Sequence, residues 1–290
     1  MSFKGYIKEN LPWIRSIYRK RLAPINLIHN IFDKPVVVLL YHRVNHLNRD
    51  LFNINVTPDN FERHIRILKN HYNVITFNDL KRNDIKEPSV IITFDDGYYD
   101  NYKYAFPILK KYQVPATIFI TSGGVDTGKE FWWDRLETVL FENKNLRESI
   151  ELDILNQRHI FDVSDDKKRL HSFYTLHHML FSLHPNERDM MLDRWYESYG
   201  LKVNPNNRTM TSSELIELYQ SQLVTLGAHT IHHPALKQIS REEQIQEIQS
   251  SKLFLENLLH TDIDIFAYPF GHKESFDQVT EQIVQDLGFT

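Results

Sequence analysis

The sequence contains no cysteine among its 290 residues. This absence excludes disulfide bonds, thiolate catalysis and every zinc site that depends on cysteine. Any metal ion must therefore be bound by histidine, aspartate or glutamate. The chain has 15 histidines, which is an ample supply, but this abundance makes each single histidine less informative.

The sequence also lacks a run of about 20 apolar residues, the length that a transmembrane helix requires. Neither sign of charge dominates, because the net charge at pH 7 is -4. This balance gives no reason to expect nucleic acid as a partner. Hydrophobic residues make up 41% and charged residues 25% of the chain, which is ordinary for a globular protein with a sizeable core.

Residues 1–34 mix aromatic and aliphatic side chains with Lys and Arg. Because basic residues interrupt every apolar stretch, we expect no secretory signal peptide and a cytoplasmic protein. The mixture suits an amphipathic helix at the inner face of an anionic membrane, and it equally suits a helix packed on its own domain. We predict that residues 35–290 form one domain.

Several short apolar runs have the β-branched composition of buried strands, and helix-length segments separate them. Strands that alternate with helices predict an α/β fold with a mainly parallel sheet or barrel. The predicted strands are Val36–Tyr41, Val74–Phe77, Val90–Phe94, Ala116–Thr121, Val224–Ala228 and Ile263–Tyr268. The predicted helices begin at Thr57-Pro58 and at the capping boxes Thr211-x-x-Glu214 and Ser240-x-x-Glu243, and cover Tyr98–Tyr112 and Phe276–Leu287.

The pattern changes at about residues 126–210, which are rich in charged and aromatic residues and have no clear strand run. We predict a mostly helical insertion there. Trp132 and Trp133 lie near its start, and exposed rings of this kind stack on sugar faces. Both are candidates for substrate binding, and the alternative is that they anchor the insertion to the rest of the domain.

One predicted strand ends in two adjacent carboxylates, within the segment Val90–Tyr99 (VIITFDDGYY). Neighbouring strand residues point to opposite sides, but Gly97 allows the backbone to turn where Asp95 and Asp96 lie. Both carboxylates can then face the space beyond the strand's carboxyl end, where α/β folds build their sites. The alternative is a simple turn signalled by Asp96-Gly97, with Asp95 as a cap.

His229 follows another predicted strand and lies four residues before His233. On one helical turn, this spacing points two imidazoles the same way, as metal sites require. Fifteen histidines produce roughly 0.7 such pairs by chance, and His42 and His46 form a second pair, so the spacing alone is weak evidence. The position after a strand is more informative, because a fold that gathers strand ends brings these histidines to the aspartate pair.

Three motifs follow one another in a specific order: Thr93–Gly97 (TFDDG), His229–Pro234 (HTIHHP) and Phe266–Gly271 (FAYPFG). With Leu40–Val44 (LYHRV) before them, the sequence resembles the polysaccharide deacetylases of the NodB-homology type, also called carbohydrate esterase family 4. The resemblance covers about residues 35–125 and 211–290. It implies an irregular (β/α) barrel of about seven parallel strands.

By this resemblance, Asp96, His229 and His233 would hold a divalent metal ion, in the first place Zn²⁺, with Co²⁺ or Ni²⁺ as alternatives. Asp95 would be the general base for a metal-bound water that attacks an acetamide carbonyl. The backbone N–H of Phe270 would stabilise the resulting oxyanion. Independently of the family, two imidazoles and one carboxylate suit this chemistry, because they leave positions on the metal open for water and substrate.

The chain departs from the family pattern in two ways. The arginine of the third motif, which is thought to orient the base, is replaced near Ala267. The histidine that protonates the leaving amine is expected beyond Thr290, so we expect a truncated carboxyl end. His42 is a candidate substitute for this acid, and equally a histidine with a structural role. Tyr268, in the third motif, is a candidate for substrate contact.

The resemblance thus implies a bacterial hydrolase that removes N-acetyl groups from amino sugars of a surface polysaccharide or its precursor. Its expected partner is an N-acetylated oligo- or polysaccharide, and residues 1–34 are a candidate for peripheral membrane contact. Two alternatives stay open: a catalytically weak glycan-binding protein, and an O-acetyl esterase that uses the same metal site. Ester cleavage depends less on a leaving-group acid than amide cleavage does.

Overall fold

The computed structural model describes residues 34–82, 85–154 and 157–290. The predicted amphipathic segment, apart from Lys34, lies outside the described residues. The main sheet is parallel and has the strand order β1 (Val36–Tyr41), β5 (Ser89–Phe94), β6 (Ala116–Ile120) and β9 (Val224–Ala228); β4 (Asn73–Val74) pairs with the first residues of β5. The chain therefore has the α/β class and the parallel sheet that its sequence predicts.

The strand register brings the carboxyl ends of the strands to one edge of the sheet. Tyr41 pairs with Phe94, Phe94 with Ile118, and Ile120 with Ala228. Beyond β9, Ala228 forms a parallel bridge with Phe266. Residues 42, 95, 121, 229 and 267, which follow these positions, are therefore gathered along one edge. A separate parallel pair, β2 (Arg43–Val44) and β3 (Asn55–Val56), lies just after β1 in the chain.

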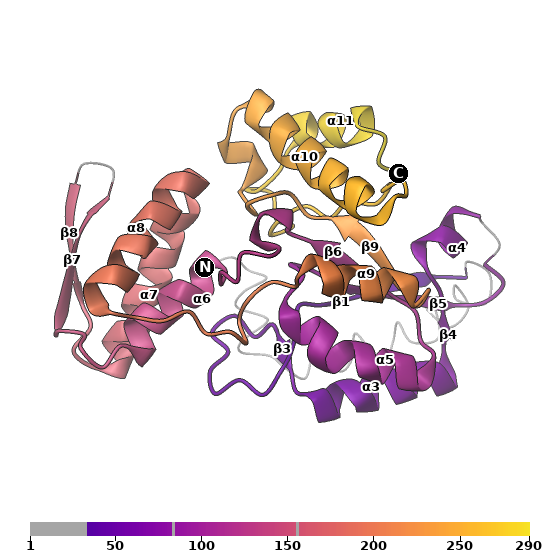
Figure 1. Cartoon of the computed structure of the whole chain (residues 1–290), viewed down its shortest axis with the longest axis horizontal. Helices are drawn as coiled ribbons and strands as arrows, with labels where there is room; N and C mark the ends of the chain where they lie inside the picture. Colours follow the sequence, from indigo (N-terminus) through magenta and orange to yellow (C-terminus); the bar gives the residue numbers. More distant parts are fainter. Residues whose placement is uncertain (1–33, 83–84, 155–156) are drawn as a thin grey trace, which may run out of the picture.

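Helices flank the sheet. Figure 1 shows α3 (Pro58–His71) and α5 (Phe106–Tyr112) along the lower edge of the view, and α10 (Arg241–Leu259) and α11 (Gln278–Asp286) along the upper edge. α9 (Ser212–Gln220) contacts β9 and α10. The three predicted N-caps are confirmed, because the side chains of Thr57, Thr211 and Ser240 each accept a hydrogen bond from a first-turn N–H.

The predicted helix Tyr98–Tyr112 is confirmed from Tyr99 on, with an irregular turn inside it. A π-helical turn, Asn101–Ala105, runs directly into α5, and Pro107 is the second residue of α5. Proline lacks the N–H that the interior of a regular helix uses, and π-helical turns are a usual form of irregularity within a helix. The proline therefore coincides with a π-helical turn and not with a late start of the helix.

The first strand is confirmed, but its predicted burial is wrong. The exposed fractions of Val37, Val38 and Leu40 are 50%, 50% and 54%. In the described part of the chain β1 pairs only with β5, so it is an edge strand of the sheet. Five strands form this sheet within the described residues, whereas the family resemblance implies about seven.

Two other predicted strands are shorter than expected. Only Asn73–Val74 pairs in the region of Val74–Phe77, because Thr76 caps α4 (Phe77–Lys81) in a capping box with Asp79. The segment Ile263–Tyr268 is not a regular strand, and Phe266 alone forms a bridge. Its course beside β9 nevertheless carries the chain to the site.

Between residues 126 and 210 the chain forms α6 (Trp132–Glu137), α7 (Asp166–Phe181) and α8 (Pro185–Tyr199), which lie to the left of the sheet in Figure 1. An antiparallel hairpin of β7 (Ser149–Ile154) and β8 (Gln157–Asp162) lies at the outer end. The sequence analysis missed this hairpin. The alternation of Ile150, Leu152 and Ile154 with polar residues was the overlooked signal.

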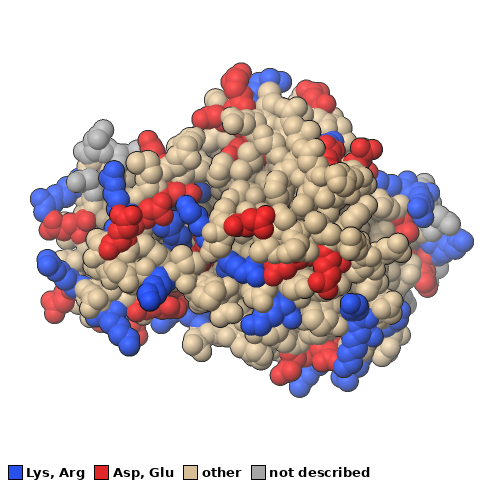
Figure 2. Space-filling view, viewed as in Figure 1, with Lys and Arg blue, Asp and Glu red and all other residues tan. Residues whose placement is uncertain are grey.

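The described residues form two hydrophobic cores. One surrounds β5 and β6 and includes Ile92, Phe94 and Leu109. The other lies in the insertion and includes Trp132, Phe173 and Tyr98, the last of which comes from the segment after β5. In Figure 2, acidic and basic side chains are interspersed on the visible face, without a broad area of one sign. None of the described helices is long and apolar enough to span a membrane.

Candidate active site

A turn at the end of β5 brings two carboxylates to the edge of the sheet. Asp96 and Gly97 both have positive φ, 74° and 79°, so the turn uses two left-handed residues and not glycine alone. The N–H of Asp95 donates to the Tyr41 carbonyl at 3.0 Å, and the N–H of Thr121 donates to the Asp96 carbonyl at 3.3 Å. The last residue of β1 and the residue that follows β6 therefore hold this turn on both sides.

The two histidines lie in an irregular loop after β9, and not on the helical turn that their spacing suggests. Thr230 and His233 have positive φ, 65° and 52°. The N–H of His233 donates to the Thr230 hydroxyl at 3.1 Å, and the N–H of His229 donates to the Ile120 carbonyl at 3.0 Å. The loop still brings the two imidazole centroids within 4.8 Å of each other.

Both imidazoles face the same carboxylate oxygen. The Oδ1 atom of Asp96 lies 3.5 Å from Nε2 of His229 and 3.2 Å from Nε2 of His233. All three side chains are buried, and their three candidate ligand atoms lie within 4.8 Å of one another. Nδ1 of His229 lies 2.8 Å from the Ala267 carbonyl, so Nδ1 donates and Nε2 keeps a lone pair for a ligand.

The electrostatics of these three groups favour a shared cation. Burial alone would raise the pKa of Asp96, but the imidazoles of His229 and His233 beside it hold this pKa below its usual range. Burial lowers the pKa of His233 to about 4, whereas the carboxylates Asp96 and Asp95 outweigh burial at His229 and raise its pKa. Two imidazoles thus compete for one carboxylate, and a metal ion among them would satisfy all three.

Asp95 lies beside this cluster, in a pocket of about 260 Å³. Burial raises the pKa of Asp95. No Lys or Arg forms an ion pair with Asp95 in the described part of the chain, so no such pair takes the place of the missing arginine of the third motif. The pocket is lined by Leu40, His42, Phe52, Ile54, Asp95, Asp96, Trp133, His177, His229, His233, Tyr268, Phe270 and Gly271.

Most residues proposed from the sequence meet in this pocket, including His42, Trp133, Tyr268 and Phe270. Trp132 does not line it. Its ring is 3% exposed, stacks on His177 at 4.6 Å and lies under the Arg188 guanidinium at 4.7 Å. Consecutive helix residues point about 100° apart, so Trp133 faces the pocket while Trp132 supports its wall from behind.

His177 is a pocket residue that the sequence analysis missed. It comes from α7 in the insertion, and its ring also lies 4.8 Å from that of Phe52. Burial, together with the positive charge of Arg188, lowers its pKa to about 4, so the imidazole is neutral near pH 7. No sequence signal identifies it among 15 histidines, because its position depends on how the insertion folds back.

Glu247 of α10 was also missed, and it holds the histidine loop in place. Its Oε2 atom accepts hydrogen bonds from the N–H groups of Ile231 and His232, each at 2.9 Å. Its Oε1 atom lies 2.6 Å from Nδ1 of His232. One buried carboxylate therefore fixes the backbone between the two candidate metal ligands.

Comparisons with solved structures agree with this architecture. IcaB from Ammonifex degensii matches with a TM-score of 0.56 and 19% identity over 88% of this chain and 81% of that chain. The deacetylase PplD of Streptococcus pyogenes, solved in complex with acetate, matches with a TM-score of 0.53 and 20% identity over 88% of this chain and 80% of that chain. At these identities the likeness shows a shared fold.

Two curated relatives are similar in sequence. YxkH of Bacillus subtilis, itself assigned to the polysaccharide deacetylases, is 24% identical over 267 residues, which cover 89% of this chain and 66% of that protein. The poly-beta-1,6-N-acetyl-D-glucosamine N-deacetylase of Staphylococcus aureus is 36% identical over 110 residues, which cover 32% of this chain and 38% of that protein. The chain thus spans less than two thirds of the length of either relative.

The family model for polysaccharide deacetylases matches residues 82–145 and 190–290, together more than half of the chain. The matched residues include the aspartate turn after β5 and the histidine loop after β9. The chain therefore belongs to the polysaccharide deacetylase family and has a NodB-like α/β fold.

Proposed function

We propose that this protein is a deacetylase that removes N-acetyl groups from amino sugars of a bacterial surface polysaccharide or its precursor, and that it depends on a divalent metal ion. The observation that carries the proposal is the convergence of Asp96, His229 and His233 on one point, with Asp95 beside them. The staphylococcal relative supports an N-acetylated amino sugar as the substrate, because its name specifies poly-beta-1,6-N-acetyl-D-glucosamine.

The donor set fits Zn²⁺, which prefers imidazole nitrogen and carboxylate oxygen and keeps open positions in catalytic sites. A metal ion held by Asp96, His229 and His233 would supply Lewis acidity toward water and toward the acetamide carbonyl. Co²⁺ and Ni²⁺ suit the same nitrogen and oxygen donors. The hydrogen bond from His229 to the Ala267 carbonyl supports this role, since it orients one ring in advance.

Asp95 is assigned the role of general base. Its carboxylate lines the pocket beside the candidate metal ligands, and burial raises its pKa, which makes it a better proton acceptor. As a water molecule adds to the acetamide carbon, Asp95 would take the proton that the water loses. The C–N bond then breaks, acetate leaves, and the amine nitrogen takes up a proton.

Two further groups of the pocket are assigned to the oxyanion and to the leaving amine. The backbone N–H of Phe270 would donate to the oxyanion, and this residue, with φ of 63°, lies with its ring centroid 4.5 Å from that of His233. His42 follows β1 and lines the same pocket, and it is our candidate for protonating the leaving amine. Tyr268 and Trp133 line the pocket walls and are assigned to sugar contact.

Acetate release tests the proposal. We expect the Zn²⁺-loaded protein to release acetate from β-1,6-linked N-acetylglucosamine oligomers, and Asp95→Asn and His229→Ala to lower kcat at least 100-fold, as loss of a general base or of a metal ligand does. His178→Ala is a matched control, because His178 is exposed and lies outside the pocket. Equal rates for wild type and both active-site variants would contradict the proposal, and oligomer binding without turnover would favour a glycan-binding protein.

A further inference from the structure

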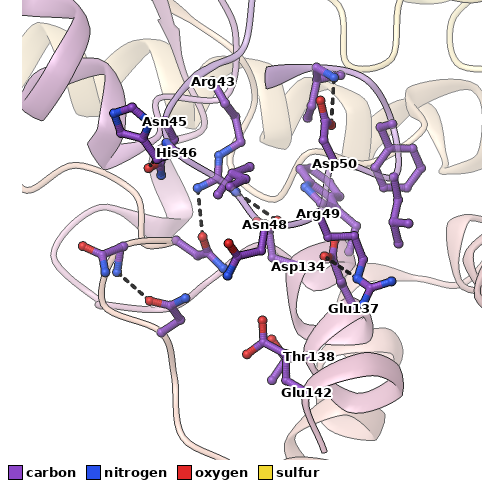
Figure 3. Close-up of a pocket in the computed structure, with 18 of the residues that line it drawn as sticks. Arg43, Asn45, His46, Asn48, Arg49, Asp50, Asp134, Glu137, Thr138 and Glu142 are labelled. Atoms are coloured by element: carbon purple, nitrogen blue, oxygen red, sulfur yellow. Dashed lines mark hydrogen bonds and ion pairs between the residues drawn. The ribbon is translucent and has the colours of Figure 1, made fainter. Parts of the chain in front are cut away.

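Two of the three arginines that are buried in the described part of the chain are paired with carboxylates. Arg43 lines a cavity of about 650 Å³, where Figure 3 shows it directed toward Asp134; its Nη1 atom lies 3.3 Å from Oδ1 of that residue. Arg135, in α6 of the insertion, lies with Nη2 at 2.6 Å from Oδ1 of Asp193 in α8. Both side chains thus have the partner that a buried charge needs.

Arg188, the third of these arginines, has no such partner. It lies in α8, is only 2% exposed, and forms no ion pair with a carboxylate of the described residues. Its Nε atom is also buried without a hydrogen-bond partner in that part of the chain. Burial lowers the pKa of Arg188 to about 10, so the guanidinium is still charged near pH 7. A buried charge without a carboxylate partner opposes folding, which indicates that this side chain serves another purpose.

Arg188 contacts the histidine loop through a backbone carbonyl. Its Nη2 atom donates to the His232 carbonyl at 3.4 Å, a long hydrogen bond whose donor is charged. The same peptide unit ends in the N–H of His233, which donates to the Thr230 hydroxyl at 3.1 Å. Both ends of the peptide unit that precedes His233 are therefore held. Since φ measures the rotation of His233 relative to this unit, the two bonds favour the left-handed φ of 52° with which the imidazole reaches Asp96.

The same guanidinium supports the wall of the metal pocket. It lies over the ring of Trp132, at 4.7 Å from the centroid, and Trp132 stacks on His177 at 4.6 Å. His177 in turn lines the pocket. Because a cation is attracted to the face of an indole, Trp132 helps to orient the side chain that donates to the histidine loop. Arg188 thus connects α6, α7 and α8 of the insertion to this loop.

We infer that Arg188 is a positioning residue through which the insertion sets the conformation of His233 as a metal ligand. The inference rests on the proposed function, because that function assigns His233 to the metal. It gives the insertion a part in forming the metal site, in addition to the wall that His177 contributes. Arg188 acts together with Glu247, which accepts the N–H of His232 at 2.9 Å while Arg188 donates to the carbonyl of the same residue.

The test measures metal binding. We would titrate Zn²⁺ into wild type, Arg188→Met and Arg188→Lys by calorimetry, and record the visible absorption of the Co²⁺-loaded proteins, which reports the geometry of the ligands. We expect Arg188→Met to bind Zn²⁺ about tenfold more weakly and to change the Co²⁺ spectrum, as the loss of a group that orients a metal ligand does. Arg188→Lys keeps the charge and a donor but not the planar fork, so its affinity should lie between those of Arg188→Met and wild type.

Arg135→Met is the matched control. Arg135 is a buried arginine of the same insertion, but it pairs with Asp193 and lies outside the metal pocket. We expect this variant to bind Zn²⁺ as wild type does and to keep the Co²⁺ spectrum. An equal loss of affinity in Arg135→Met would assign the effect to the stability of the insertion and would overturn the inference.

The other outcomes also decide the inference. Wild-type affinity and an unchanged Co²⁺ spectrum in Arg188→Met overturn it. If Arg188→Met does not fold, Arg188→Lys decides: an affinity about threefold weaker, as for a weakened hydrogen bond, supports the inference, and wild-type affinity overturns it. A wild type that binds no Zn²⁺ overturns both this inference and the proposed metal dependence. A wild type that binds Zn²⁺ but releases no acetate contradicts the proposed deacetylation alone, since the affinities still decide the role of Arg188.

Discussion

At the scale of single residues, burial sets the protonation of two carboxyl groups of α6, at the start of the insertion. Burial raises the pKa of Glu137 to about 7, and the positive charge of Arg49 only partly opposes this. Burial also raises the pKa of Asp134 to about 7, although the positive charge of Arg43 and the hydrogen bond from Tyr98 partly oppose this. These carboxyls hold protons more tightly in the folded chain than in the unfolded one.

Glu137→Gln should therefore change how stability depends on pH. The folded-state pKa of Glu137, about 7, lies above the ordinary value of 4.5. The contribution of this group to the free energy of unfolding is therefore fully present below pH 4.5, and it is lost as the pH rises through 7 and the partly buried carboxyl ionises. We expect the variant to be more stable than wild type by about 1 kcal/mol near pH 8, and little changed near pH 4.5, allowing for solvent screening. Urea unfolding at both pH values measures this, and a difference independent of pH would contradict it.

His177 should act in substrate binding. Its neutral ring lines the metal pocket, and no hydrogen bond holds its nitrogens within the described residues. We expect His177→Ala to raise KM for N-acetylglucosamine oligomers about tenfold, with kcat changed less than threefold, because a contact present throughout the reaction alters binding alone. His178→Ala, at the next and exposed position of α7, is the control. A 100-fold loss of kcat would instead make His177 a proton donor.

At the scale of elements, strand ends and helix starts were predictable because they depend on local chemistry. Asp95 and Asp96 follow a β-branched run, and the capping residues Thr211 and Ser240 mark the starts of α9 and α10. The histidine loop was not predictable in its geometry. Thr230 and His233 both adopt left-handed conformations, and for Thr230, a β-branched residue, this conformation is an outlier that tertiary contacts must hold in place.

Glu247 is the tertiary contact that we expect to matter most for this loop. Glu247→Ala removes the acceptor of two backbone N–H groups between His229 and His233. Losing a partner that orients metal ligands typically weakens metal affinity by roughly 10–100-fold. Zn²⁺ titration calorimetry should show this loss. Glu242→Ala, exposed on the same helix, should bind Zn²⁺ as wild type does, and equal affinities for both variants would refute the assigned role.

At the scale of the whole molecule, the site joins segments that are far apart in the chain. His42, Asp95, His229 and Phe270 come from the ends of the parallel strands and the segment beside them, whose grouping an α/β pattern predicts. His177 comes from the insertion, and nothing in its local sequence indicates where α7 packs. The sequence therefore predicts the metal side of the pocket and Trp133, but it does not predict His177.

The two cores make the insertion a separate unit of stability. Phe173→Ala leaves a cavity in the core of the insertion, and we expect a cost of about 3–5 kcal/mol there. Hydrogen exchange should then show lost protection in α7 and α8, with β5 and β6 largely unaffected. Leu109→Ala, in the other core, should give the reverse pattern. Equal loss of protection in both regions for both variants would show that the cores unfold together.

The central claim is that Asp96, His229 and His233 bind the metal ion on which deacetylation depends. The most direct measurement strips the protein with a chelator, titrates Zn²⁺ back, and follows bound metal and acetate release from β-1,6-linked N-acetylglucosamine oligomers in the same samples. We predict that activity returns in proportion to one Zn²⁺ per chain, and that Asp96→Asn binds Zn²⁺ far more weakly and recovers little activity. Full acetate release from the stripped protein would contradict the account.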